Sequence, residues 1–160
     1  MGSRAGGGSA QRGEGGAALS GYLIDSSALW RILRSGQVHE LWRTATIYGD
    51  VRACYPQRAE FLSSARDLKE YSELRDMYDD LYREVSVPKS ASTWITKVQH
   101  LAAKAGCLTC FSAVDLQICA TAAHHGLTIV HDDRDFVTAT RFAAELREVN
   151  VHDGPLNLGI

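Results

Sequence analysis

The feature that most constrains the fold is the alternation of short apolar runs with longer helical patterns. Apolar, strand-like runs occupy residues 22–25, 51–56 and 127–130, and a last one follows at 147–152. Between them, apolar side chains recur every three to four residues, which is the spacing of an amphipathic helix. Strands that alternate with helices predict an α/β fold, in which helices cover both faces of a parallel sheet.

The helical patterns have recognisable ends. Glycines follow several of them and act as stop signals, because glycine is favoured just past a helix C-terminus. The segment 57–85 is too long for one helix of a small domain, so we expect a break near residues 65–68. A short extended segment, 86–88, should precede the next helix. The helical patterns cover residues 26–36, 39–49, 57–85, 91–106, 115–126 and 135–146.

Acidic residues stand where these runs meet. Asp25 directly follows the first apolar run, Asp133 and Asp135 follow the run at 127–130, and Asp115 opens a helix. The carboxyl ends of parallel strands form one edge, where open α/β sheets bind ligands. Glu60, inside a helix, could lean over the same edge. Because clustered carboxylates repel one another, this arrangement predicts a site for a divalent cation and metal-assisted phosphoryl chemistry.

Each of these acids also has a structural interpretation. Asp25 could cap the helix that follows it, and Ser112 with Asp115 has the spacing of a capping box. The two acids after the run at 127–130 could cap the next helix, and Glu60 could simply be solvated. Capping and metal binding are compatible for Asp25 and Asp115, because a carboxylate at a helix N-terminus stays ionised.

Composition fits one domain in 160 residues with 45% hydrophobic content. No apolar run approaches the ~18 residues of a membrane span, so we expect a cytoplasmic protein that does not associate with membranes. Residues 1–20 are Gly-rich and predict a disordered leader or tag, residues 21–153 the folded domain, and residues 154–160 a flexible tail. Without the five candidate acids, 14 acidic residues face 17 Lys and Arg, a balance compatible with RNA.

The four cysteines predict no metal site. Cys107 and Cys110 form one CxxC pair, but a structural zinc site needs a second pair of ligands at similar spacing, and none follows. We therefore expect reduced, buried or half-buried cysteines, with Cys54 and Cys119 among them.

Three segments together carry a resemblance to a known family. They are IDSSAL near the start, the mid-chain Glu60, and SAVDLQICATAAHHGLTIVHDDRDF near the end. With their spacings, they resemble PIN-domain ribonucleases, and among these the VapC-like toxins of bacterial toxin–antitoxin pairs. The resemblance covers residues 22–151, and the last segment is its most specific part.

The resemblance implies a three-layer α/β/α fold with a mainly parallel sheet and a metal-dependent endoribonuclease that uses Mg2+, with Mn2+ able to substitute. It also implies an RNA substrate, a cognate antitoxin and a homodimer. His131 departs from the family pattern, because many members have Thr or Ser there. By this resemblance, the main metal ligands are Asp25 and Asp115. Further catalytic acids and ligands are Glu60 and Asp133, and supporting residues are Ser26 and Asp135.

Other roles follow from the residues themselves. The helices at residues 37–48 and 67–84 could form a groove for an antitoxin segment or be ordinary packing faces. His124 and His125 precede Gly126 at a helix end and are interpreted as structural. Four arginines near the acids could bind phosphate or be solvated surface: Arg31, Arg34, Arg134 and Arg141.

Three alternatives to the toxin remain. The first is a housekeeping PIN nuclease that processes RNA without an antitoxin. The second is a PIN-like module that binds RNA or protein without cutting, which the complete set of acids disfavours. The third, a receiver-like signalling domain, lacks the paired acids expected just after the first strand.

Overall fold

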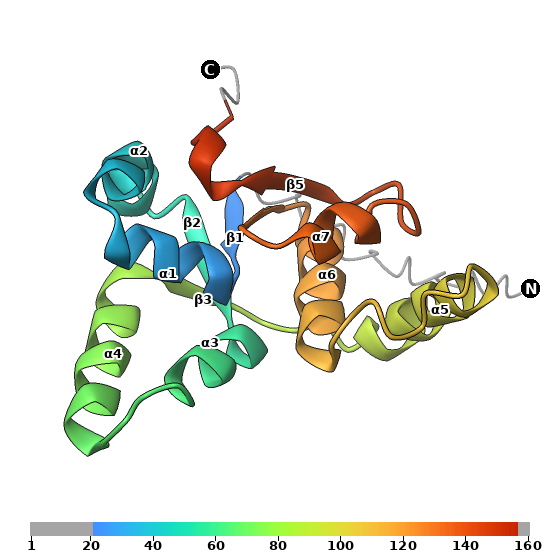
Figure 1. The fold of residues 1–160 in the computed structure, drawn as a ribbon, viewed down its shortest axis with the longest axis horizontal. Helices are drawn as coiled ribbons and strands as arrows, with labels where there is room; N and C mark the ends of the chain where they lie inside the picture. The colour runs from blue at the N-terminus through green and yellow to red at the C-terminus, as the bar shows by residue number, and fades with distance from the viewer. Residues whose placement is uncertain (1–20, 157–160) are drawn as a thin grey trace, which may run out of the picture.

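The computed structural model describes residues 21–156, so the predicted leader at residues 1–20 and the end of the predicted tail, 157–160, lie outside the described residues. The described chain forms a five-stranded parallel sheet with the order β3-β2-β1-β4-β5 (Figure 1). The chain runs outward from β1 through β2 to β3 and then returns to β4 on the other side of β1. The strands are β1 (Tyr22–Ile24), β2 (Val51–Cys54), β3 (Arg83–Val85), β4 (Thr128–His131) and β5 (Arg147–Asn150).

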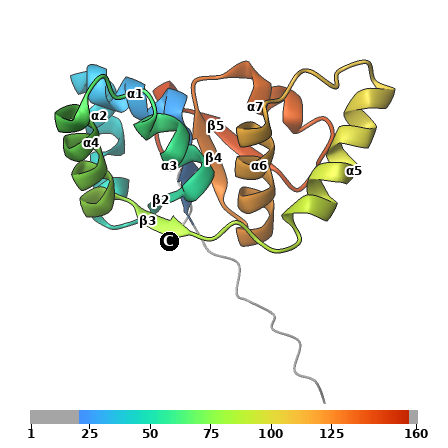
Figure 2. The same ribbon diagram turned by 90° about the horizontal axis from the view of Figure 1, so that it is seen from below.

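Helices cover both faces of this sheet. In Figures 1 and 2, α1, α2 and α4 gather on one side, whereas α5, α6 and α7 gather on the other. Within residues 21–156, no helix is both long and apolar enough to cross a membrane. The helices are α1 (Ser26–Arg34), α2 (Gly36–Ile47), α3 (Tyr55–Leu62), α4 (Leu68–Leu81), α5 (Ala91–Lys104), α6 (Ala113–His125) and α7 (Arg134–Ala139), with a 3-10 turn at Val151–Asp153.

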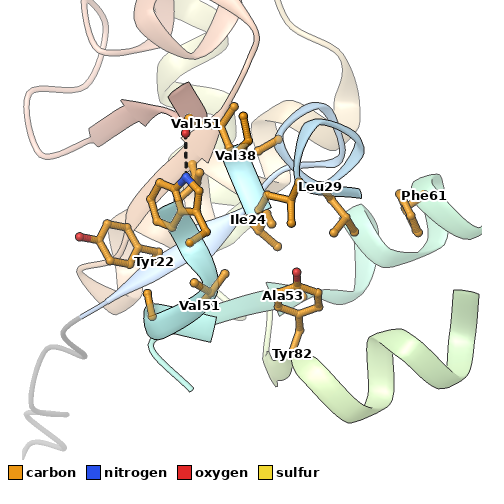
Figure 3. Packing of buried hydrophobic residues seen from close by; sticks show 14 of the residues in the cluster. Tyr22, Ile24, Leu29, Val38, Val51, Ala53, Phe61, Tyr82 and Val151 are labelled. Carbon is orange, nitrogen blue, oxygen red and sulfur yellow. Dashed lines mark hydrogen bonds between the residues drawn. The ribbon is translucent and has the colours of Figure 1, made fainter. Parts of the chain in front are cut away.

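The strands divide their side chains between two cores. Tyr22 and Ile24 point into the core under α1, α2 and α4, whereas Leu23 points into the core under α5 and α6. This division follows from the two-residue period of a β-strand. Figure 3 shows the first core, where the Trp42 indole nitrogen donates a hydrogen bond to the Val151 carbonyl at 2.7 Å and ties α2 to the turn after β5. The predicted three-layer α/β/α fold is confirmed.

Several predicted boundaries are confirmed and others are wrong. Residues 55–56, predicted as the end of a strand, begin α3, and residues 151–152, also predicted as strand, belong to a 3-10 turn. The break near residues 65–68 exists, because α3 ends at Leu62 and α4 begins at Leu68. Residues 83–85 were predicted as helix but form the edge strand β3, which pairs with β2 and buries Val85. The last predicted helix, 135–146, stops at Ala139. The strand β3 has only three residues, too few to show a two-residue period in the sequence.

The cysteine prediction is half correct. Cys54 and Cys119 are free and buried, as expected. Cys107 and Cys110 are not reduced, because the structure joins them in a disulfide within the loop between α5 and α6. Sequence spacing alone could not distinguish these states, since a CxxC turn brings both sulfurs together whether or not they are bonded.

Candidate active site

The candidate site lies at the topological switch point of the sheet, where the order in which the chain adds strands reverses. β1 and β4 are neighbours, and the chain leaves them toward opposite edges of the sheet. Such a switch point opens a crevice at the carboxyl ends of the two strands. Asp25 follows β1 and Asp132 follows β4, and the Asp25 backbone N–H donates to the Val130 carbonyl at 2.9 Å. The two strand ends are therefore held side by side.

Asp25 is the most deeply placed acid of the site. It is 5% exposed and caps α1, because its Oδ2 accepts hydrogen bonds from the Ser27 N–H at 2.9 Å and the Ser27 hydroxyl at 2.5 Å. Burial raises the pKa of Asp25, the hydrogen bonds from Ser27 oppose the rise, and the charge of Asp115 adds to it. Asp25 caps the helix as expected, but its pKa is not held low as expected of a capping acid, because burial outweighs the hydrogen bonds.

Ser27 is a site residue that the sequence analysis missed. Its hydroxyl donates to Asp25 and also accepts a hydrogen bond from the Asp132 N–H at 2.9 Å. It therefore links the ends of β1 and β4. The sequence signal for it is the Ser26-Ser27 doublet directly after Asp25.

Asp115 sits at the start of α6 in the predicted capping box. Its N–H donates to the Ser112 hydroxyl at 3.0 Å, and its Oδ2 accepts from the Ser112 N–H at 2.9 Å. The negative charge of Asp115 contributes to the raised pKa of Asp25 and of Glu60, after burial in each case. Asp115 thus lies within electrostatic reach of both acids.

Glu60 extends the acidic group from α3, which packs beside α6 (Figure 2). It is exposed, and its Oε2 accepts a hydrogen bond from the Ser26 hydroxyl at 3.1 Å. Partial burial raises the pKa of Glu60, the bond from Ser26 lowers it, and the charges of Asp25 and Asp115 raise it further. Glu60 is therefore not simply solvated, because α3 and Ser26 hold it toward the other acids.

The acids after β4 are held by a buried histidine. Asp133 caps α7 by accepting from the Asp135 N–H at 2.9 Å, and its own N–H donates to Nδ1 of His131 at 3.1 Å. His131 is 1% exposed, and its Nε2 lies 2.7 Å from a Glu148 carboxylate oxygen. Since Nδ1 accepts a hydrogen bond, the ring carries its proton on Nε2 and donates it to Glu148. His131, which stands where many family members have Thr or Ser, thus connects Asp133 to Glu148 of β5 through two hydrogen bonds.

Asp135 joins the acidic group more loosely. Burial raises its pKa, and the charges of Asp133 and Asp115 raise it further. Electrostatic interactions thus connect the five predicted acids, and we call this set the acidic arc. One part of the arc is Asp25, Glu60 and Asp115, and the other is Asp133 with Asp135.

Asp132 is the second residue that the sequence analysis missed. It forms an ion pair with Arg31 at 2.5 Å, and the Asn150 amide lies 3.4 Å from its second oxygen. Burial favours the protonated form, but the hydrogen bonds from Arg31 and Asn150 outweigh it and lower the pKa of Asp132. Arg31 therefore has a carboxylate partner within the chain. The signal was the paired acids of HDD, from which only the second was chosen.

The other proposed arginines differ in their surroundings. The Arg34 guanidinium lies over the Trp30 ring, 4.6 Å from its centroid. Arg134 is exposed at the start of α7 and lines a hollow of about 670 Å3, and Arg141 is exposed. His125 behaves as predicted, because it lies in the last turn of α6 and its ring contacts the Ser86 carbonyl at 2.8 Å.

The acidic arc is open. Within residues 21–156, no three His, Cys, Asp or Glu side chains are drawn together tightly enough to enclose a metal ion by themselves. The donor set nevertheless fits magnesium, because it consists of carboxylate oxygens, and magnesium keeps several waters and needs only one or two carboxylates. Among these acids, Asp25, Glu60 and Asp115 are near enough for their charges to act on one another.

A second surface feature lies between α1, α2 and α4. It is a narrow groove of about 210 Å3, and three apolar side chains on it are exposed: Leu33, Ile47 and Leu81. Each comes from a different helix, so the groove is a product of tertiary packing. The remaining lining residues are Ile32, His39, Arg43, Thr46 and Tyr82.

The chain is similar to several known proteins. It is 46% identical over 97 residues to Ribonuclease VapC6 of Mycobacterium tuberculosis strain H37Rv, a match that covers 61% of this chain and 76% of that protein. Its fold matches VapBC2 from Rickettsia felis bound to a promoter DNA fragment, with a TM-score of 0.67 and 12% identity, over 81% of this chain and 97% of that one. It also matches VapBC-5, from the VapBC family of toxin–antitoxin systems of Mycobacterium tuberculosis. That TM-score is 0.57 at 21% identity, over 82% of this chain and 98% of the other.

The family model of the PIN domain matches residues 22–141, which contain the sheet switch point and every acid of the arc. This match extends over most of the described chain. The predicted resemblance is confirmed at the level of the family, and the chain belongs to the PIN domain family.

Proposed function

We propose that this protein is a metal-dependent endoribonuclease that acts as the toxin of a toxin–antitoxin pair. The observation that carries the proposal is the convergence of Asp25, Glu60 and Asp115 at the switch point, where burial and mutual repulsion raise the pKa of Asp25 and Glu60. Carboxylates held together at such a cost are typical of a cation site. The relatives named Ribonuclease VapC6 and VapBC-5 support the choice of RNA as substrate and of a toxin role.

The acids divide the work by position. Asp25 and Asp115 would ligate the ion. Each carboxylate is oriented by hydrogen bonds that it accepts at the start of its helix, Asp25 from Ser27 and Asp115 from Ser112. Glu60 and Asp133 would position water molecules around it, and Asp135 would add negative charge. When bound, magnesium or manganese supplies charge neutralisation on the phosphate and lowers the pKa of a water that attacks phosphorus.

The RNA backbone would approach the arc from the side of the exposed cations. Arg134, at the first position of α7, is the arginine closest in sequence to the acids, and it lines an open hollow together with Asp132 and Asp133. Arg31 is less available, because Asp132 already pairs with it. We therefore assign phosphate contact to Arg134 in preference to Arg31.

The groove between α1, α2 and α4 would bind the antitoxin. Exposed Leu33, Ile47 and Leu81 offer apolar contacts to an amphipathic helix, which is one of the recurring ways to recognise a peptide. A basic side chain of the antitoxin could then reach the acids and pair with them in place of the metal. We also propose that the active form is a homodimer, which size-exclusion chromatography with light scattering would test.

Cleavage of RNA by the purified protein tests the proposal directly. Incubation with total RNA and Mn2+ or Mg2+, followed by mapping of new 5′ ends, should show defined internal cuts. Expression of the chain alone should arrest growth, and co-expression with the product of a neighbouring upstream reading frame should restore it. Cleavage without growth arrest or a binding partner would favour the housekeeping nuclease. Binding of RNA without any cut would favour the non-cleaving module.

A further inference from the structure

A buried glutamine connects the site to α4. Gln57, on α3, is fully buried, and burying an amide is unfavourable unless its hydrogen bonds are satisfied. Its Oε1 accepts a hydrogen bond from the Tyr78 hydroxyl of α4, and its Nε2 lies 3.5 Å from the Ser26 hydroxyl oxygen. Ser26 in turn donates to Glu60 at 3.1 Å. These four side chains, Tyr78, Gln57, Ser26 and Glu60, form a continuous chain of hydrogen bonds that we call the relay.

The chemistry of the groups gives the relay a direction. The Gln57 nitrogen is only a donor, so beside it the Ser26 oxygen must accept. The single hydroxyl hydrogen of Ser26 is then free to point at the Glu60 carboxylate. If the amide were turned over, its oxygen and the Glu60 carboxylate would compete for that one hydrogen. The amide orientation that satisfies every group is therefore the one that aims Ser26 at Glu60.

Tyr78 holds the amide in this orientation. It is 1% exposed and packs against Phe61, with ring centroids 5.6 Å apart, so its hydroxyl has little freedom to move away from Gln57. A tyrosine hydroxyl can donate or accept, but here it donates to Gln57 Oε1, and this bond places the oxygen end of the amide beside Tyr78 and the nitrogen end beside Ser26. The relay thus begins in the core beneath α4 and ends at the rim of the acidic arc.

We propose that Gln57 is a positioning residue for the reaction, because it fixes the Ser26 hydroxyl as a donor to Glu60 and so holds the Glu60 carboxylate toward the metal position. The inference rests on the proposed function and adds a residue to it. Gln57 lies below Ser26 and touches neither substrate nor ion. Its whole effect should therefore pass through Ser26, which distinguishes positioning from a general loss of stability.

A double-mutant cycle tests this path. Gln57→Met keeps the side-chain length and removes the amide, and Ser26→Ala removes the hydroxyl. We expect each single variant to slow RNA cleavage about tenfold, because each removes a hydrogen bond on the path to the Glu60 carboxylate. The double variant should be no more than about twofold slower than Ser26→Ala. If Gln57 acts only through the Ser26 hydroxyl, its replacement has no further effect once that hydroxyl is absent. Multiplied effects, or wild-type rates in Gln57→Met, would overturn the proposal.

Calorimetric titration with Mn2+ provides a readout that does not depend on cleavage. Gln57→Met and Ser26→Ala should weaken Mn2+ binding by similar factors, again without further loss in the double variant. If wild type binds Mn2+ but does not cut RNA, the proposed function fails and the binding cycle still decides the relay. If wild type does not bind Mn2+, both fail.

Tyr78→Phe is the second variant, and it decides the question if Gln57→Met does not fold. It leaves the amide in place but frees it to turn, so we expect a smaller slowing of about threefold, and none when Ser26 is already replaced by alanine. The matched control is Tyr22→Phe, which removes a buried tyrosine hydroxyl bonded to the Leu156 carbonyl at 3.0 Å, at the far end of β1. Equal slowing in Tyr22→Phe and Tyr78→Phe would show a general packing effect and overturn the relay.

Discussion

The acidic arc and the groove between α1, α2 and α4 differ in how their side chains are held. At the arc, hydrogen bonds from Ser27 and Ser112 fix Asp25 and Asp115 before any ligand binds. In the groove, Ile47 is 67% exposed, and it offers area without a hydrogen bond to fix it. A preorganised polar site suits chemistry, in which charges must be in place before reaction, whereas an exposed apolar groove suits a partner that supplies the missing contacts.

Removal of the divalent metal should have the largest effect, and only at the arc. Excess EDTA should abolish RNA cleavage, because the carboxylates alone cannot neutralise a phosphate. Manganese should restore cleavage at least as well as magnesium, and calcium should restore it poorly, since its looser coordination shell polarises water less. Antitoxin binding in EDTA, measured by calorimetry, should persist. Full cleavage in EDTA would contradict the mechanism.

Asp115→Asn should come next, with a loss of cleavage of about 100-fold or more. A neutral amide ligates magnesium weakly, but its oxygen can still accept the hydrogen bond from the Ser112 N–H, so the melting temperature should stay within about 2 °C of wild type. The matched control is Asp67→Asn, which alters the N-cap of α4, where Asp67 accepts from the Glu70 N–H at 2.8 Å. Cleavage by Asp115→Asn within a few-fold of wild type would remove Asp115 from the site.

Ile47→Glu should affect the groove and spare the acidic arc, which is the reverse of the effect of Asp115→Asn. A charge in place of an apolar contact should weaken antitoxin binding by about 10- to 100-fold, since full burial of such a side chain contributes ~1.5–3 kcal/mol. Cleavage of RNA without antitoxin should stay near wild type. Leu68→Glu is the control, because Leu68 is 79% exposed at the start of α4 and does not line the groove. Equal weakening by both variants would place the antitoxin elsewhere.

The smallest effect concerns pH. Burial raises the pKa of Asp25 above its ordinary value of 3.8, so the stability that protonated Asp25 contributes is fully present below pH 3.8. It is lost as pH rises through the raised pKa. The amide introduced by Asp25→Asn would be neutral throughout, so without metal the melting temperature of this variant should gain on wild type by a few degrees between about pH 4 and pH 7.

A variant of opposite sign controls the pH experiment. Hydrogen bonds from Arg66 lower the pKa of Glu70, so ionised Glu70 contributes stability above its ordinary pKa of 4.5 that is lost as pH falls. The melting temperature of Glu70→Gln should therefore fall relative to that of wild type as pH rises. Saturating Mn2+ should erase the gain of Asp25→Asn by stabilising wild type. A gain that is independent of pH would mean that Asp25 is not strained by its burial.

Local rules made most of the fold predictable. The alternation of strands and helices, the break between α3 and α4, and the capping box of Asp115 all depend on residues no more than a few positions apart. Hydrogen bonds at a helix start connect residues two or three positions apart, as between Asp25 and Ser27, so the sequence displays them directly. The acids of the arc were candidates for the same reason, and their ligation of metal stays a prediction.

Tertiary structure decided what connects distant segments. The strand β3 exists because β2 offers it a partner, Arg31 is occupied because Asp132 lies beside it after a separation of 101 residues, and Gln57 is buried because α4 packs over it. None of these pairings is visible in the sequence as a periodic pattern or a local motif. The free energy of each comes from contacts that form only after the sheet assembles. The sequence thus determined which acids stand at strand and helix ends. Only the assembled sheet decided which side chains orient these acids through hydrogen bonds and which pair with their charges.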